Sequence, residues 1–212
     1  MSSPPTFSSY ARLAATIEEL YRVFSAKPPP VIEACPCCIE TRNVDVLLAT
    51  PLRQLSGGQL WRYITGAYLT VGGDRDFRYL MPRIFELAAL DPFEVPDTEI
   101  VLGKLARARW EMWRAEEKDA ILTVIGAWFS VALEQDLQHA EEGWIYKTES
   151  LLCGIAHAGL PLADWLIRLT EPAYTPILAD LRERYPRDLS SFWNDAPDGL
   201  AQLSTVLDEG AA

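Results

Sequence analysis

The sequence predicts an all-α protein, an irregular multi-helix bundle or a short α-solenoid of roughly eight to ten helices. Two observations lead to this class. Apolar residues recur at helical spacing in most segments, and proline, glycine and capping residues separate these segments. No segment alternates with period two for long enough to form a convincing strand. Consecutive helix pairs suit both architectures, and no clean fixed-period repeat supports the solenoid.

The N-terminal region predicts two helices and a linker. From Tyr10 to Phe24 the apolar residues follow the i, i+3, i+4, i+7 spacing of an amphipathic helix. Residues 1–8 before it are expected to form a loose tail, and Pro28-Pro29-Pro30 ends the helix. Residues 26–42 are a Pro- and Cys-rich linker, and a short helix follows from Asn43 to Ala49.

Two further helices are predicted from capping residues. Ser56 and Gln59 have capping-box spacing, and Gly72-Gly73 closes the helix that they open. Asp74 or Asp76 caps the next helix, in which Pro82 marks a kink or the true first turn. The expected buried face of the first of these helices is Leu60, Trp61, Ile64, Ala67, Tyr68 and Val71.

The second half of the chain predicts one long helix among shorter ones. Asp97 caps a helix that reaches Met112, and Ala115 to Gln138 is apolar nearly all round, which is typical of a helix in the middle of the packing. Residues 143–158 continue the helical period, with Gly159 as the residue after the helix. Shorter helices centre on residues 165–169, 174–181 and 200–207. We expect residues 1–212 to form a single helical domain.

The charge balance excludes some classes of partner. The chain has a formal net charge of −11, whereas nucleic acids and anionic membranes attract basic surfaces.

The longest apolar run, Ala120 to Leu133, is shorter than the roughly 18 residues of a membrane span. The N-terminus lacks a basic region followed by an apolar stretch, so we expect a cytoplasmic protein that binds neither nucleic acid nor membrane.

Three of the four cysteines lie close together. Cys35, Cys37 and Cys38 include one C-x-x-C spacing, which is typical of a zinc site or a redox pair. No second metal-binding pair accompanies them, and the βαβ context of a thioredoxin-like motif is missing. The commoner interpretation is a set of reduced cysteines that pack a loop against the core, so we expect no cofactor.

Acidic residues flank the predicted long helix. In the simpler interpretation they form its solvated ends, and in the functional one they form a face that docks a basic protein. Two tryptophans beside them would be interface hot spots if exposed, although buried rings are commoner. The candidate partner-binding residues are Glu116, Glu117, Glu134, Asp136, Glu141, Glu142, Trp110 and Trp113.

The familiar motifs of enzymes are missing from the sequence. Residues 72–76 are glycine-rich but follow no predicted strand, so they do not indicate a phosphate loop. The two histidines, His139 and His157, lack convergent partners in the sequence. The sequence therefore favours a binding protein, although an enzyme site assembled from scattered residues stays open.

One resemblance points the same way. The segments Cys35-Pro-Cys-Cys38 and Asp76-Phe-Arg-Tyr-Leu-Met-Pro-Arg83 resemble uncharacterised bacterial helical proteins, some of which occur beside polymorphic toxins. The resemblance spans roughly residues 35–135 and carries over no catalytic residue. It implies a cytosolic protein that works by binding another protein. The leading hypothesis is therefore an immunity-type inhibitor that occludes a basic partner such as a toxin domain, with a metal- or redox-dependent protein as the alternative.

Overall fold

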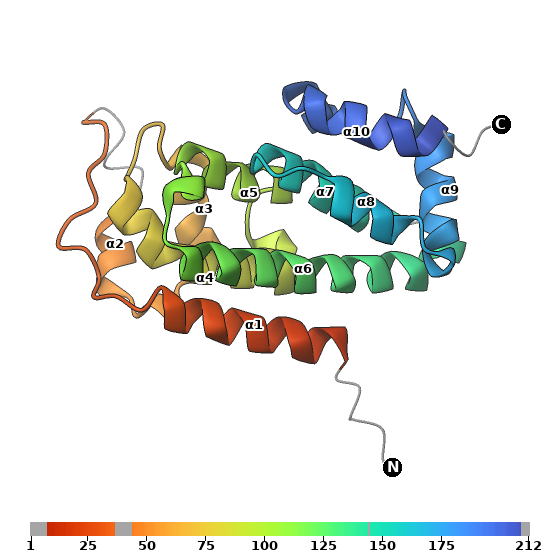
Figure 1. The fold of residues 1–212 in the computed structure, drawn as a ribbon. Helices are drawn as coiled ribbons and strands as arrows, with labels where there is room; N and C mark the ends of the chain where they lie inside the picture. Colours follow the sequence, from red (N-terminus) through yellow and green to blue (C-terminus); the bar gives the residue numbers. More distant parts are fainter. Residues whose placement is uncertain (1–7, 37–43, 144, 209–212) are drawn as a thin grey trace, which may run out of the picture. The chain divides into compact units, whose positions relative to one another are not determined.

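The computed structural model describes residues 8–36, 44–143 and 145–208, and within them it contains ten α-helices and no β-strand (Figure 1). The predicted all-α class is therefore confirmed. The contacts divide the chain into two compact units, Met1–Val95 with Trp110–Val131 (unit 1) and Pro96–Arg109 with Ala132–Ala212 (unit 2). The single-domain organisation stays a prediction.

Unit 1 is built around the packing of α1 against α4 (Figure 1). Apolar residues at helical spacing, among them Leu13, Ile17 and Leu20, bury one face of α1 completely. Ser8 caps this helix by accepting a hydrogen bond from the amide of Ala11. The elements of unit 1 are α1 (Ser9–Val23), α2 (Val44–Ala49), η2 (Leu52–Gln54), α3 (Gly57–Gly66), α4 (Asp74–Leu90), η3 (Pro92–Glu94), η4 (Trp110–Met112) and the first part of α6 (Ala115–Gln138).

The start of α3 confirms the predicted capping box, but its end does not match the prediction. The Ser56 side chain accepts from the amide of Gln59, and the Gln59 side chain accepts from the amide of Ser56. The helix stops at Gly66 instead of continuing to Gly72, because Ala67 leaves the helical region with ψ of 132° and Tyr68 then takes a left-handed backbone conformation with φ of 62°. Trp61, expected on the buried face, is 45% exposed.

Asp76 fixes the turn that joins α3 to α4. It is buried, and its carboxylate accepts from the hydroxyl of Tyr63 at 2.6 Å and from the amide of Gly73 at 3.1 Å. Gly72 has φ of +66°, and a side chain there would collide with Asp76, so only glycine fits this position. Pro82 lies inside α4 and therefore does not mark its first turn.

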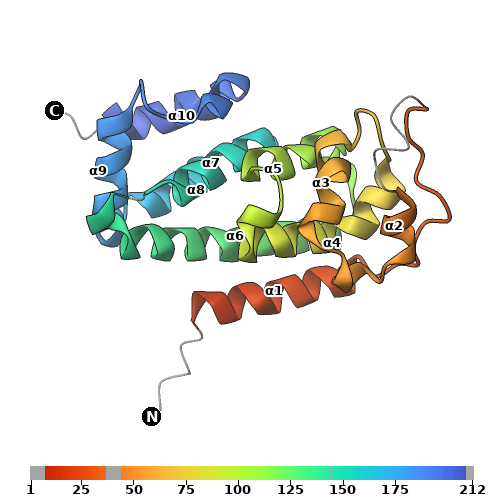
Figure 2. The ribbon, with the colours of Figure 1, turned by 180° about the vertical axis from the view of Figure 1, so that it is seen from behind.

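Unit 2 is organised by the close packing of α5 and α7 (Figure 2). Gly103 on α5 faces His157 of α7, and Gly154 on α7 faces Leu102 and Thr98 of α5. These glycines let the two backbones approach closely, since an added methyl group at Gly154 would already lie 3.0 Å from Leu102. The elements are α5 (Thr98–Arg107), the last part of α6, η5 (Ala140–Glu142), α7 (Lys147–His157), α8 (Ala163–Leu169), η6 (Pro172–Tyr174), α9 (Thr175–Arg184), η7 (Ser191–Asp195) and α10 (Pro197–Asp208).

In the second half the largest differences from the predicted helix bounds occur at two ends. The α5 helix ends at Arg107, not at Met112, since Arg109 has a positive φ of 46°. The α7 helix begins at Lys147, later than expected. The bounds of α6 match the predicted long helix, and Gly159 has the positive φ expected of a residue that follows a helix.

The α6 helix is the one described helix that is long and apolar enough to cross a membrane. Of its most apolar window, 67% is buried inside the structure, as in the core helix of a soluble protein. Its apolar surface is therefore used largely in packing.

Candidate functional site

Unit 1 contains a pocket of about 230 Å³ whose walls carry three arginines, which we name the arginine pocket. Arg75 and Arg78 lie three residues apart near the start of α4, so both side chains fall on one face of that helix. Arg114 directly precedes α6. The full lining is Val23, Phe24, Ser25, Ala26, Arg75, Arg78, Tyr79, Arg114 and Glu117.

Glu117 holds two of these arginines in place. Its carboxylate oxygen Oε1 accepts from Nη2 of Arg78 and from Nη2 of Arg114, the latter at 2.8 Å. Its Oε2 accepts from the backbone amide of Arg114 at 3.1 Å. Burial raises the pKa of Glu117, but the hydrogen bonds from Arg114 and Arg78 outweigh it and lower the pKa overall. Glu117 is therefore ionised near neutral pH.

The three guanidinium groups differ in their surroundings. The guanidinium of Arg78 lies over the ring of Trp113, 4.6 Å from its centre, and this cation–π contact orients it. Arg114 is mostly exposed apart from its bonds to Glu117. Arg75 is exposed, and its guanidinium forms no hydrogen bond or ion pair with any other residue that the structure describes. With Glu117 counted, the pocket carries a net charge of about +2.

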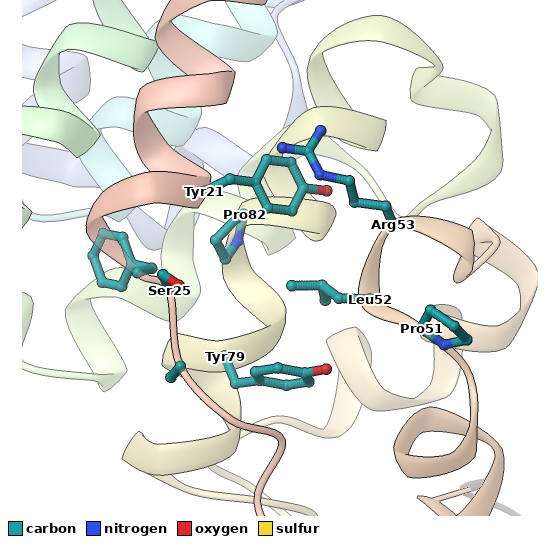
Figure 3. Close-up of a pocket in the computed structure, with 9 residues that line it drawn as sticks. Tyr21, Ser25, Pro51, Leu52, Arg53, Tyr79 and Pro82 are labelled. Carbon is teal, nitrogen blue, oxygen red and sulfur yellow. The ribbon is translucent and has the colours of Figure 1, made fainter.

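A second pocket of about 430 Å³ adjoins the first and shares Phe24, Ser25, Ala26 and Tyr79 with it (Figure 3). We name it the aromatic pocket. Figure 3 shows that its walls come from the end of α1, from η2 and from α4. Its remaining lining residues are Tyr21, Pro51, Leu52, Arg53 and Pro82.

Hydrogen bonds and a cation–π contact link the polar residues along the aromatic pocket. The guanidinium of Arg53 lies 3.8 Å from the centre of the Tyr21 ring and makes two bonds of 2.7 Å to Glu18. The Tyr21 hydroxyl donates to Glu86 at 2.5 Å, and Arg83 donates to the same carboxylate. Burial, with this hydrogen bond, raises the pKa of Tyr21, so its hydroxyl stays protonated. Together the pockets offer cations beside aromatic and aliphatic surface.

Half of the predicted partner-binding residues are buried, which corrects their place on an exposed face. Glu117 is 2% exposed and pairs with arginines as described above. Asp136 is completely buried, and its carboxylate accepts from the amides of Lys147 and Thr148 at the start of α7. Trp110 and Trp113 are 6% and 8% exposed, in agreement with the commoner interpretation of buried rings.

The other predicted acidic residues are exposed. Glu116 lies in unit 1 and forms an ion pair with Arg22 at 3.1 Å. Glu134, Glu141 and Glu142 lie in unit 2, at the end of α6 and in η5. Tyr146, four residues beyond Glu142, is 45% exposed, and this aromatic neighbour is absent from the residues predicted to bind a partner.

Negative charge is concentrated in unit 2. Its segments contain 16 acidic and 8 basic residues, a net charge of −8, whereas unit 1 contains 14 acidic and 11 basic residues, a net charge of −3. The arginine pocket therefore lies in the less acidic unit. Of the four exposed acidic residues that were predicted to bind a partner, three lie in the more acidic unit.

Two buried glutamates of unit 2 lie within hydrogen-bond networks. Glu149 on α7 accepts from Arg184, from the amide of Ser190 at 2.6 Å and from the indole of Trp193 at 3.3 Å. Glu99 on α5 accepts from the Ser150 hydroxyl at 3.0 Å, and burial raises its pKa to about 7.

The predicted cysteine cluster is only partly described. Cys37 and Cys38 lie outside the described residues, and the amide of Cys35 donates to the carbonyl of Thr70 at 2.8 Å. Across residues 8–36, 44–143 and 145–208, no group of three His, Cys, Asp or Glu side chains is arranged to hold a metal. Cys153 is buried, and burial raises the pKa of its thiol.

Sequence reasoning missed both pockets. The spacing of Arg75 and Arg78 was visible, but their convergence with Arg114 depends on a contact across 39 residues. A comparison with known protein families, curated proteins and solved structures gives no match for this chain.

Proposed function

We propose that this chain is a cytoplasmic protein-binding module, an immunity-type inhibitor that binds and occludes a basic partner such as a toxin domain. The observation that carries the proposal is the concentration of negative charge in unit 2, where Glu134, Glu141 and Glu142 are exposed. Carboxylates gathered in one region attract a basic protein and steer its approach.

An exposed aromatic residue strengthens the proposal. Tyrosine is enriched among the residues that dominate binding energy at interfaces, and Tyr146 follows the acidic residues of η5 closely. It takes the role that the buried Trp110 and Trp113 are unable to fill. The proposed contact surface is therefore Glu134, Glu141, Glu142 and Tyr146.

The experiment is a pull-down of the tagged chain from its native lysate at low salt, followed by kinetics with the purified partner. The triple variant Glu134→Lys, Glu141→Lys, Glu142→Lys should slow association by at least about tenfold and flatten its salt dependence. Reversal of three exposed acids of unit 1, Glu94, Glu111 and Asp119, changes the total charge equally and serves as the control.

The two variants separate specific docking from general attraction. A basic partner that the control retains and the unit 2 variant loses supports the proposal. Equal slowing in both variants contradicts the proposed surface, and the absence of any stoichiometric partner contradicts the binding-module function. Inhibition of the partner's activity by the wild-type chain tests the inhibitor role separately.

A further inference from the structure

The arginine pocket is a cationic feature on an acidic protein, and the proposed binding of a basic partner does not use it. The formal net charge is −11, and yet three guanidinium groups line one pocket of about 230 Å³. Arginines on a solvated surface usually point away from one another. Here Arg78 and Arg114 instead meet at the same oxygen of Glu117, so the fold holds two positive charges close together.

The surroundings of these arginines favour a bound anion. Glu117 neutralises one charge and leaves about two unbalanced. The Trp113 ring and the carboxylate hold Arg78 in one orientation, so little side-chain freedom remains to be lost on binding. The guanidinium of Arg75 is not bonded to any residue that the structure describes, so its donors can reach a ligand. Arg75 lies one helical turn from Arg78.

The charge and the donor geometry fit a phosphate better than a carboxylate. A phosphate monoester carries a charge of about −1.5 to −2 near pH 7 and has three strong acceptor oxygens. Guanidinium groups match these oxygens with paired N–H donors, which makes arginine the usual residue for phosphate recognition. A single carboxylate would leave about one positive charge unbalanced.

The adjoining aromatic pocket indicates what kind of group would carry such a phosphate. The two pockets share four lining residues, and the larger one adds Tyr21, Leu52 and Pro82 as apolar surface (Figure 3). Its volume of about 430 Å³ falls in the range of pockets that hold small organic molecules, roughly 300–1,000 Å³. We propose that unit 1 binds a small organic phosphomonoester, with its phosphate in the arginine pocket and its apolar body in the aromatic pocket.

The test is isothermal titration calorimetry of the full chain with phenyl phosphate at low salt and neutral pH. We expect one site, and we expect Arg75→Gln and Arg114→Gln each to weaken binding by about tenfold or more, as loss of a charge-assisted hydrogen bond implies. Arg12→Gln is the matched control, since Arg12 is an exposed arginine of α1 that does not line either pocket. Circular dichroism checks that each variant is folded.

Each outcome decides one part of the proposal. No binding of phenyl phosphate to the wild-type chain, or an equal loss in Arg12→Gln, overturns it. Inorganic phosphate that binds as tightly as phenyl phosphate supports the anion site and overturns the role of the aromatic pocket. Benzoate that binds as tightly as phenyl phosphate overturns the choice of phosphate. None of these results bears on partner binding by unit 2, so the two proposals fail independently.

Discussion

Glu117 in unit 1 and Glu149 in unit 2 are both buried glutamates that pair with arginine, but their surroundings differ. The protein itself satisfies Glu149 with Arg184, a backbone amide and an indole, and Arg184 also bonds to Asp180. Glu117 instead lies in the wall of a pocket, and its partner Arg114 is 68% exposed. A buried glutamate can thus join a network that the protein satisfies completely, or it can hold arginines in the wall of a pocket. The surroundings of the arginine decide between the two.

The largest expected effect is on stability in unit 2. Glu149→Ala removes the acceptor of three donors and leaves Arg184 only partly paired. Breaking a buried ion pair in this way costs about 3–5 kcal/mol. Urea unfolding of the variant measures it, and Glu183→Ala, an exposed change on α9, is the control. A loss below about 1 kcal/mol would mean that the Glu149 network is no stronger than a surface ion pair.

The next effect concerns the pH dependence of stability in unit 2. Burial raises the pKa of Glu99 to about 7 from an ordinary value of 4.5, so the folded state favours the protonated form. The stability that protonated Glu99 contributes to the folded state is fully present below pH 4.5 and is lost as the pH rises through about 7. The shift in pKa corresponds to at most about 3 to 4 kcal/mol of stability.

Unfolding of Glu99→Gln across this pH range checks the prediction. The amide does not ionise, so the difference in stability between the variant and the wild type should grow in the variant's favour from pH 4.5 to 7. A constant difference over that interval would show that Glu99 titrates normally in the folded chain.

The smallest stability effect, and the sharpest test of the comparison, is Glu117→Gln. Because Arg78 and Arg114 reach solvent, we expect a loss of only about 1–2 kcal/mol. The pocket becomes more positive, while Trp113 still orients Arg78, so the added charge should outweigh the looser placement of the arginines. We therefore expect phenyl phosphate to bind a few-fold more tightly to Glu117→Gln, whereas Glu149→Gln should leave binding unchanged. Calorimetry with both variants measures this, and weaker binding in Glu117→Gln would mean that its main role is to position the arginines.

Local signals predicted most of the helices. The apolar stripe of α1, the capping box of α3 and the apolar run of α6 each depend on neighbours within a few residues, and the structure confirms all three. The missed end of α3 has a different cause. Tyr68 adopts a positive φ, and the segment after it bonds to the linker, where the Cys35 amide donates to Thr70. A contact across 35 residues leaves no periodic trace in the sequence.

In the candidate site, contacts between distant residues decide even more than they do in the helices. Glu116 and Glu117 are adjacent in the sequence, and yet the first is exposed and the second is 2% exposed. A carboxylate at the start of a helix suits both environments, and only the approach of Arg78 from α4 decides between them. The same holds for Asp136, which differs from the exposed Glu134 because α7 begins against it.

The sequence by itself determined the all-α class, the positions of most helices and the excess of negative charge, because composition and local periodicity encode these properties. The tertiary structure alone decided which acids are buried and which arginines meet around one pocket. Those features depend on pairs of residues far apart in the chain, and the spacing within a helix shows which face is buried but not what that face contacts.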